Sequence, residues 1–185
     1  NPATDKRSPM PFFQPLLILK INTRILSLVT TNHSLNSPIG VFDSGLGGLT
    51  VLKSLEKILP KESFIYYGDT AHVPYGTKSA ETVTQYSRHI LKFFLKHKTK
   101  AVVIACNTAS AVAFRHLQTA YDIPLFDVVS PSVEYSINIP KTREIGVIGT
   151  YSTIHSKAYT EMFKKLGSDC KIYEVPCPLF VPIIE

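Results

Sequence analysis

The sequence predicts an α/β fold of three-layer domains with mainly parallel sheets, and three observations support this class. Short β-branched and apolar runs alternate with segments whose apolar residues recur at helical spacing, which is the pattern of strand–helix–strand units. The run KAVVIAC (100–106) is continuously apolar, as expected of a parallel strand that is buried on both faces. Hydrophobic residues make up 44% of the 185 residues and charged residues 18%, which is typical of a globular protein.

The predicted elements begin at residue 39. The run IGVF (39–42) predicts a buried strand, and apolar residues at helical spacing over 49–59 predict the helix that follows. SFIYYG (63–68) predicts the second strand, and Ser79 is a typical N-cap residue that predicts the start of the next helix. Further strands are expected at 100–106, 123–129, 144–150 and 170–175, with helices at 109–119 and 153–166.

The chain is expected to have three parts. Residues 1–38 hold five of the 13 prolines and none of the nine glycines, so we expect a poorly ordered extension that the fold does not need. A first α/β domain is predicted over 39–138 and the start of a second over 139–185. The boundary is placed at NIPKTRE, where a helix-like stretch meets a proline and charged residues.

Charge and cysteine content argue against several classes of protein. The net charge of +6 is modest and dispersed, so nucleic-acid binding is not predicted. Charged residues interrupt the apolar stretch 11–29, which argues against a membrane span, and no clear signal peptide is present. The three cysteines are therefore expected to be reduced thiols of a cytoplasmic protein. No CxxC motif and no histidine pair at helical spacing occur, so no metal site is predicted.

Polar side chains stand at the ends of several predicted strands. The carboxyl ends of parallel strands meet at one edge of a sheet, where ligands of open α/β sheets bind, so we expect these side chains to converge. A thiol, an amide, hydroxyls and backbone N–H groups near helix N-termini suit a small zwitterion, with Asp43 facing its ammonium group. The set comprises Asp43, Ser44, Asp69, the loop VPYGTK (73–78), Cys106, Asn107, Thr108 and Thr150.

The glycine-rich segment DSGLGG (43–48) has two interpretations. It lacks the GxxxxGK[ST] pattern, and it misses GxGxxG because Thr50 stands where the last glycine belongs, so a nucleotide site is weakly supported. A tight strand-to-helix turn explains these glycines about as well as ligand binding does.

Cys106 decides which chemistry the sequence favours. A cysteine at the end of a buried strand is most often a small apolar filler. Here Asn107 and Thr108 can donate hydrogen bonds, and the N-terminus of the following helix is expected to lower the thiol pKa. A thiolate could act as a nucleophile or as a base. No histidine follows a strand in an obvious partner position, although His72 lies near one, and this favours proton transfer over hydrolysis.

Five segments of the sequence are informative together: GVFDSGLGGLTV (40–51), YYGDTAHVPYGTKS (66–79), ACNTAS (105–110), VIGTYSTIHSKAY (147–159) and CPLFVPIIE (177–185). They resemble glutamate racemases, the cofactor-independent enzymes of bacterial cell-wall synthesis. The resemblance covers 39–185 with the segments in order, and aspartate racemases share the CNT core but lack this DSG start.

The resemblance implies a role for each matched residue. Cys106 matches the cysteine base that exchanges a proton with one face of the substrate α-carbon. Asp43 matches an aspartate that holds the substrate and supports proton transfer, and Glu185 resembles an acidic residue near the second half-site. The expected substrate-binding residues are Asp43, Ser44, Pro74, Tyr75, Gly76, Asn107, Thr108 and Thr150.

The resemblance also implies two similar domains with the active site between them, glutamate as the small-molecule substrate, no cofactor or metal, and D-glutamate supply for peptidoglycan. It leaves a homodimer open. The family's second cysteine lies in a glycine-cysteine-threonine-histidine motif that 1–185 lack, so we expect a chain truncated before its second catalytic half and inactive alone. Cys170 and Cys177 are expected to be structural. An aspartate or other amino-acid racemase, or a non-catalytic module that binds a small ligand, are the alternatives.

Overall fold

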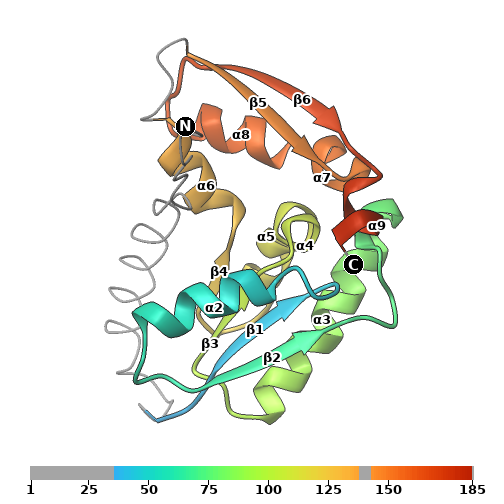
Figure 1. The fold of residues 1–185 in the computed structure, drawn as a ribbon. Coiled ribbons are helices and arrows are strands. Elements are labelled where there is room, and N and C mark those ends of the chain that lie inside the picture. The colour runs from blue at the N-terminus through green and yellow to red at the C-terminus, as the bar shows by residue number, and fades with distance from the viewer. Residues whose placement is uncertain (1–35, 138–142, 185) are drawn as a thin grey trace, which may run out of the picture.

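The computed structural model describes residues 36–137 and 143–184, which form two parallel sheets of unequal size (Figure 1). The larger sheet has the strand order β2-β1-β3-β4, and the smaller one pairs β5 with β6. The predicted α/β class with parallel sheets is confirmed. The strands are β1 (Ile39–Asp43), β2 (Phe64–Gly68), β3 (Ala101–Ile104), β4 (Leu125–Asp127), β5 (Glu144–Gly149) and β6 (Lys171–Pro176).

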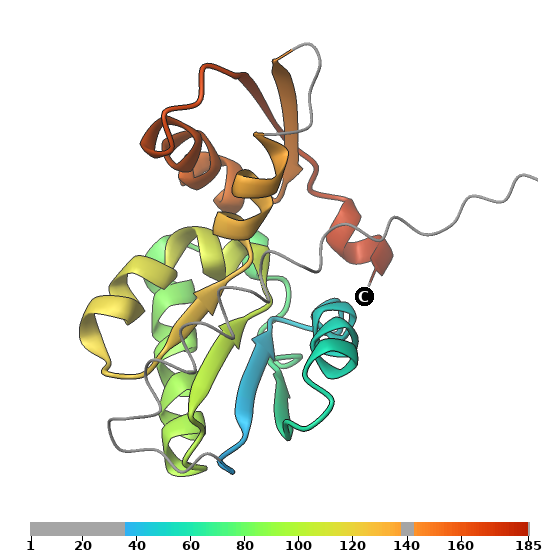
Figure 2. The same ribbon diagram turned by 90° about the vertical axis from the view of Figure 1, so that its left-hand side faces the viewer.

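Helices connect successive strands along the described chain, as parallel pairing requires. In the larger sheet, α2 covers one face and α3 the other, which the edge-on view of Figure 2 shows. The helical elements are α2 (Leu49–Ile58), the short 3-10 helix η1 (Tyr75–Thr77), α3 (Ala80–Lys96), α4 (Asn107–Val112), α5 (Phe114–Ala120), α6 (Val129–Ser136), α7 (Tyr151–His155), α8 (Ala158–Lys165) and α9 (Phe180–Ile184).

The central strands β1 and β3 are buried on both faces because their residues are apolar without alternation. Phe42 and Phe94 belong to the core between the sheet and α3, whereas Val41 and Leu55 belong to the core beside α2. Each such side chain contributes about 1.5–3 kcal/mol by leaving water. At Gly40 an added Cβ would lie 2.7 Å from Cδ1 of Phe94, so the glycine lets α3 approach the sheet closely.

The predicted N-cap of α3 is present. The Oγ of Ser79 accepts a hydrogen bond from the backbone N–H of Thr82 at 3.2 Å, and Glu81 lies in the first turn, where the helix dipole favours a negative charge.

Two predicted helices are each divided in the structure. The helix expected at 109–119 is α4 and α5, with a break at Ala113, and the helix expected at 153–166 is α7 and α8. At the second break Lys157 has a left-handed backbone with φ of 57°. The Oγ of Ser156 donates to the carbonyl of Thr153 at 2.6 Å and so competes with the helical main-chain pattern. Apolar spacing continues across both breaks and therefore does not reveal them.

The predicted strand 123–129 is also shorter than expected. It ends at Asp127, whose Oδ2 accepts a hydrogen bond from the N–H of Ser130 at 2.7 Å and so caps the first turn of α6. Val128 and Val129 therefore leave the sheet and begin the helix-like stretch that the sequence indicates before the proposed boundary.

The smaller sheet is covered on one face. Ile145 of β5 and Ile172 of β6 pack against a core cluster that contains Phe163 of α8 and Val133 of α6. On the opposite face Ile148 is 61% exposed and Val175 is 53% exposed. No helix in the described ranges 36–137 and 143–184 has both the length and the apolar character that crossing a membrane requires.

Two parts of the predicted domain division lie largely outside the described residues. The boundary between 138 and 139 falls in the segment 138–142, and most of the extension 1–38 precedes residue 36. Pro38 is described, and its carbonyl accepts a hydrogen bond from the N–H of Lys100 at 2.9 Å, so this residue already belongs to the fold. The division stays a prediction.

Candidate functional site

The ends of β1, β2 and β3 bring a carboxylate and a thiol to one edge of the larger sheet. Asp43 is the last residue of β1 and stands opposite Gly68 of β2. Cys106 follows β3 and is the N-cap residue of α4. Both side chains are buried, with 6% exposure for Asp43 and 5% for Cys106. The parallel register thus brings together the groups that sequence reasoning expected to meet.

The glycine-rich loop folds around the carboxylate of Asp43. Its Oδ2 accepts hydrogen bonds from the backbone N–H groups of Gly45 at 3.2 Å and Gly48 at 3.0 Å. An added Cβ at Gly48 would lie 2.6 Å from the Cβ of Asp43, so a side chain there would push the loop away. These contacts favour the interpretation of the glycines as a tight strand-to-helix turn, and they fix the Asp43 carboxylate beside the thiol.

The Cys106 thiol lies between Ser44 and the start of α4. Its Sγ is 3.6 Å from the Oγ of Ser44, to which it donates, and it accepts from the N–H of Ala109 at 3.5 Å. Burial raises the pKa of Cys106 to about 11, and the charge of Asp43 adds to the rise. The N–H of Ala109 at the start of α4 lowers the thiol pKa, as expected, but the expected net lowering is wrong, because desolvation outweighs this N–H and the hydrogen bonding with Ser44.

The predicted substrate loop lies over the same core. Pro74 follows a cis peptide bond, and Tyr75 is buried at 1% exposure in the cluster that contains Cys106. The hydroxyl of Tyr75 donates to Oδ2 of Asp69 at 2.5 Å. Burial, followed by this hydrogen bond and the nearby charge of Asp69, raises the pKa of Tyr75 far above its ordinary value. Tyr75 is thus a neutral donor. Its partner Asp69 was expected at the edge of the sheet but was not given a catalytic or substrate-binding role.

Three threonine hydroxyls connect α4 with the start of α7. The Oγ1 of Thr108 lies 3.0 Å from that of Thr150 and 3.3 Å from that of Thr153. Thr150 also caps α7, because its Oγ1 accepts from the N–H of Thr153 at 3.2 Å. Thr153 was missed because its place in a helical pattern indicates packing only.

Gly76 joins the substrate loop to the same place. A Cβ added at Gly76 would lie 2.3 Å from the Cβ of Thr150, and the Oγ of Ser152 donates to the carbonyls of Gly76 at 3.0 Å and Lys78 at 2.8 Å. The loop after β2 therefore depends on α7 for its position.

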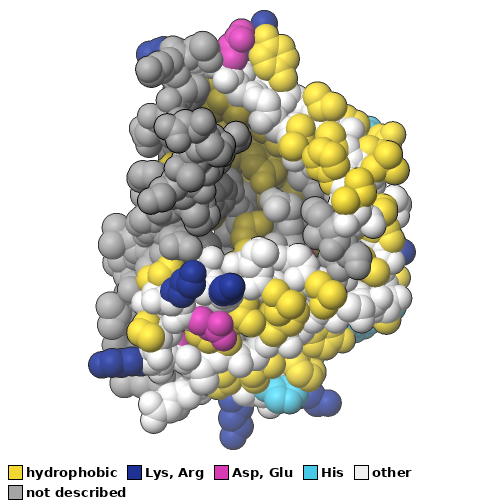
Figure 3. Space-filling model, viewed as in Figure 1, with side chains coloured by type: hydrophobic (Ala, Val, Ile, Leu, Met, Phe, Trp, Pro, Cys, Tyr) yellow, Lys and Arg dark blue, Asp and Glu magenta, His cyan; other side chains and the backbone are white. Residues whose placement is uncertain are grey.

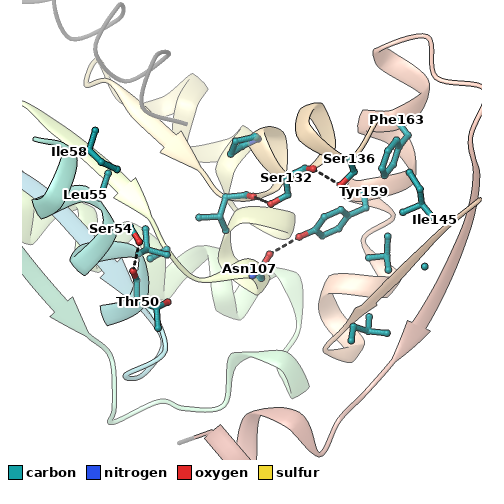
Figure 4. Close-up of a pocket in the computed structure, with 17 residues that line it drawn as sticks. Thr50, Ser54, Leu55, Ile58, Asn107, Ser132, Ser136, Ile145, Tyr159 and Phe163 are labelled. Carbon is teal, nitrogen blue, oxygen red and sulfur yellow. Dashed lines mark hydrogen bonds between the residues drawn. The ribbon is translucent and has the colours of Figure 1, made fainter. Parts of the chain in front are cut away.

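A cavity of about 630 Å³ opens next to this site, between α2 and the smaller sheet. Figure 3 shows the hollow, and Figure 4 shows α2 side chains on one wall opposite Ile145 and Phe163. Asn107 is the predicted site residue that lines it, and its Oδ1 accepts from the hydroxyl of Tyr159 at 2.7 Å. Burial raises the pKa of Tyr159 to about 12, so this hydroxyl stays protonated and donating.

Other predicted residues have simpler outcomes. Glu185 lies outside the described residues. Cys106, Cys170 and Cys177 are free thiols. Within 36–137 and 143–184, no group of three or more His, Cys, Asp or Glu side chains is arranged to hold a metal ion.

A parallel α/β sheet that places a buried thiol, a carboxylate and hydroxyls at its carboxyl edge defines a small-molecule site of the open-sheet class. A family model described as Asp/Glu/Hydantoin racemase matches residues 39–178. The chain belongs to this racemase family.

Individual relatives agree with this assignment. A glutamate racemase of Geobacter metallireducens is 49% identical over 147 residues, which cover 80% of this chain and 54% of the relative. A crystal structure of a glutamate racemase from Bacillus anthracis matches with a TM-score of 0.79 and 39% identity over 82% of this chain and 57% of that one. The Francisella tularensis glutamate racemase in complex with D-glutamate matches with a TM-score of 0.74 and 46% identity, over 80% and 56% of the two chains. The chain thus spans a little over half the length of these relatives.

Proposed function

We propose that this chain is part of a glutamate racemase that interconverts L- and D-glutamate by two-base proton transfer without a cofactor, with Cys106 as one base. The observation that supports this most directly is the buried thiol of Cys106 beside Asp43 and Ser44, on the edge where the Tyr75 loop also lies. The relatives named above support glutamate as the substrate, and one of their solved structures holds D-glutamate.

The raised pKa gives the substrate a part in activating the thiol. At pH 7, a thiol with a pKa of about 11 is ionised in about one molecule in ten thousand. Asp43 contributes to that pKa through its negative charge, so an ammonium group that pairs with Asp43 removes this contribution and adds an attractive one of its own. A zwitterionic amino acid therefore favours the thiolate that removes its α-proton.

The proton transfer also needs stabilisation of the charge left behind. The Cys106 thiolate takes the α-proton, and the electron pair of the C–H bond moves into the substrate carboxylate. Hydrogen-bond donors aimed at the carboxylate lower the energy of that state. In our proposal Asn107, Thr108, Thr150 and the backbone of the Tyr75–Gly76 turn supply these donors, as the family resemblance implies.

Inversion requires a second acid on the opposite face of the α-carbon, and one thiol serves only one face. Cys177 does not offer an obvious second base, because its Sγ donates to the carbonyl of Val175 at 3.8 Å and its N–H to that of Gly149 at 2.7 Å. We propose that the second acid comes from the part of the racemase that residues 1–185 do not span, and that Glu185 lies near it. The proposal also places the enzyme in the cytoplasm, where it supplies D-glutamate for peptidoglycan synthesis. It leaves open whether the enzyme is a homodimer.

The test uses the full-length protein, assayed with a metal chelator present and without pyridoxal phosphate. Circular dichroism monitors the racemisation of glutamate and of aspartate. Cys106→Ser should slow glutamate racemisation by about 100- to 10,000-fold, since a hydroxyl is a far weaker acid than a thiol. Glutamate should still protect this variant from thermal unfolding. Cys170→Ser, a matched change at a half-buried thiol, should keep activity within about twofold. Full activity of Cys106→Ser, loss of activity with the chelator, or a preference for aspartate would contradict the proposal.

A further inference from the structure

The carboxylate of Asp69 joins two side chains of the loop after β2. Its Oδ2 accepts a hydrogen bond from the hydroxyl of Tyr75 at 2.5 Å. The Nδ1 of His72 lies 2.8 Å from Oδ1 and 3.0 Å from Oδ2. A carboxylate only accepts hydrogen bonds, so the Nδ1 of His72 carries the proton and donates it. The Asp69 side chain is 7% exposed and that of His72 is 46% exposed, so the histidine links a buried acceptor to the surface.

His72 is itself held in two ways. Its ring stacks on Tyr86 of α3 with centroids 4.2 Å apart, and its Nδ1 bonds to Asp69. The ring of Tyr86 is in turn 5.7 Å from that of Tyr75. The stack would support the loop through packing alone, whereas the Nδ1 bond acts on Asp69, so the two contributions can be separated by substitution.

Tyr75 transmits this restraint to the thiol. It is fully buried in the core cluster that also contains Phe42 and Cys106, and interiors at native density leave little room for a tilted ring. The hydroxyl end of Tyr75 is held by Asp69, and the adjoining Gly76 is packed against Thr150. Without the bond to Asp69, packing alone restrains the hydroxyl end of Tyr75, and we expect movements of this ring that expose the neighbouring thiol to become more frequent.

We propose that His72 is a positioning residue: its Nδ1–H holds Asp69, which holds Tyr75 in the core cluster that contains Cys106. The inference rests on the proposed function, in which Cys106 is a base and the Tyr75 loop binds glutamate. His72 acts through Asp69 and Tyr75 and is not required to touch the substrate.

The test compares His72→Asn with His72→Leu in the full-length protein. Asparagine can place an amide N–H where the Nδ1 of histidine lies, and leucine has a similar size without a donor. Both variants lose the ring stack on Tyr86, so they differ mainly in the donor. The kcat/KM for glutamate should stay within about twofold in His72→Asn relative to wild type and fall about tenfold in His72→Leu, as expected for one lost hydrogen bond to a charged group.

A second measurement does not depend on racemisation. Without substrate, alkylation of Cys106 by iodoacetamide, followed by mass spectrometry of the peptide that contains it, should be about tenfold faster in His72→Leu than in wild type and within about twofold in His72→Asn. Tyr75→Phe, which keeps the ring and removes the hydroxyl, should also speed alkylation. The double variant Tyr75→Phe with His72→Leu should react no faster than the faster single variant, because both changes break one chain of contacts.

The results separate this inference from the proposed function. Equal alkylation in His72→Asn and His72→Leu, or multiplicative effects in the double variant, would overturn the role of the Nδ1 donor. A wild-type protein that does not racemise glutamate would overturn the proposed function, whereas the order of the alkylation rates would still decide the role of His72.

Discussion

Replacing Gly76 with alanine should destabilise the protein, because the substrate loop and α7 meet at this residue. The new Cβ would lie 2.3 Å from the Cβ and 2.4 Å from the Cγ2 of Thr150, so the two segments must move apart. Overpacking of this kind costs about 1–3 kcal/mol. The hydroxyl proton of Ser152, which is shared between the carbonyls of Gly76 and Lys78, would lose part of this bonding as well, at a cost of up to about 1 kcal/mol. We expect the free energy of unfolding to fall by about 2–4 kcal/mol.

Urea denaturation followed by far-ultraviolet circular dichroism measures this change in the full-length protein. Gly146→Ala is the matched control, because a Cβ at Gly146 meets no atom within 4 Å, and it should change stability by less than about 0.5 kcal/mol. Truncating Thr150 to alanine keeps its Cβ and so should not rescue Gly76→Ala. A loss below about 0.5 kcal/mol in Gly76→Ala, or a full rescue by Thr150→Ala, would refute the reasoning.

Three further predictions concern the core, the thiol and the extension. Phe94→Ala should cost about 3–5 kcal/mol in urea denaturation, because this side chain is fully buried, whereas Leu95→Ala beside it, at 37% exposure, should cost less than about 1 kcal/mol. The folded pKa of Cys106, about 11, is above its unfolded value. Its contribution to stability is therefore present at neutral pH and is lost as pH rises from about 9 to 11. Across that range wild type should lose about 2 kcal/mol more than Cys106→Ala. Deleting 1–35 should leave the melting temperature nearly unchanged, and a fall of several degrees would show that this segment packs on the core.

The sequence predicted the sheet and the residues at its edge because both depend on local patterns. Continuous apolar runs such as 100–106 indicate buried parallel strands, and the parallel class then implies that strand ends meet. Asp43 and Cys106 were therefore identified as neighbours although they are far apart in the chain. The N-cap at Ser79 was likewise readable from residue type alone.

The remaining features depend on contacts that no local pattern records. The break between α7 and α8 coincides with the side-chain hydrogen bond of Ser156 and the left-handed backbone of Lys157, and apolar spacing continues across it. Asp69 was visible as the residue after a strand, but its bonds to His72 and Tyr75 depend on how the intervening loop folds back. Gly76 and Thr150 lie far apart in the sequence, and only the packing of α7 against the substrate loop brings them together.

The pKa of Cys106 shows why residue type and position alone gave the wrong sign. A helix N-terminus lowers a thiol pKa when the thiol stays hydrated, but here burial removes water from the sulfur and Asp43 adds a negative charge. The same burial suits a base that must take a proton from a very weak carbon acid. A thiolate whose thiol has a high pKa binds that proton more strongly. The cost is that this thiolate is scarce at neutral pH. In the proposed racemase, the ammonium group of the bound substrate pairs with Asp43 and so favours the Cys106 thiolate. The reactive thiolate therefore becomes more populated only when the substrate is bound.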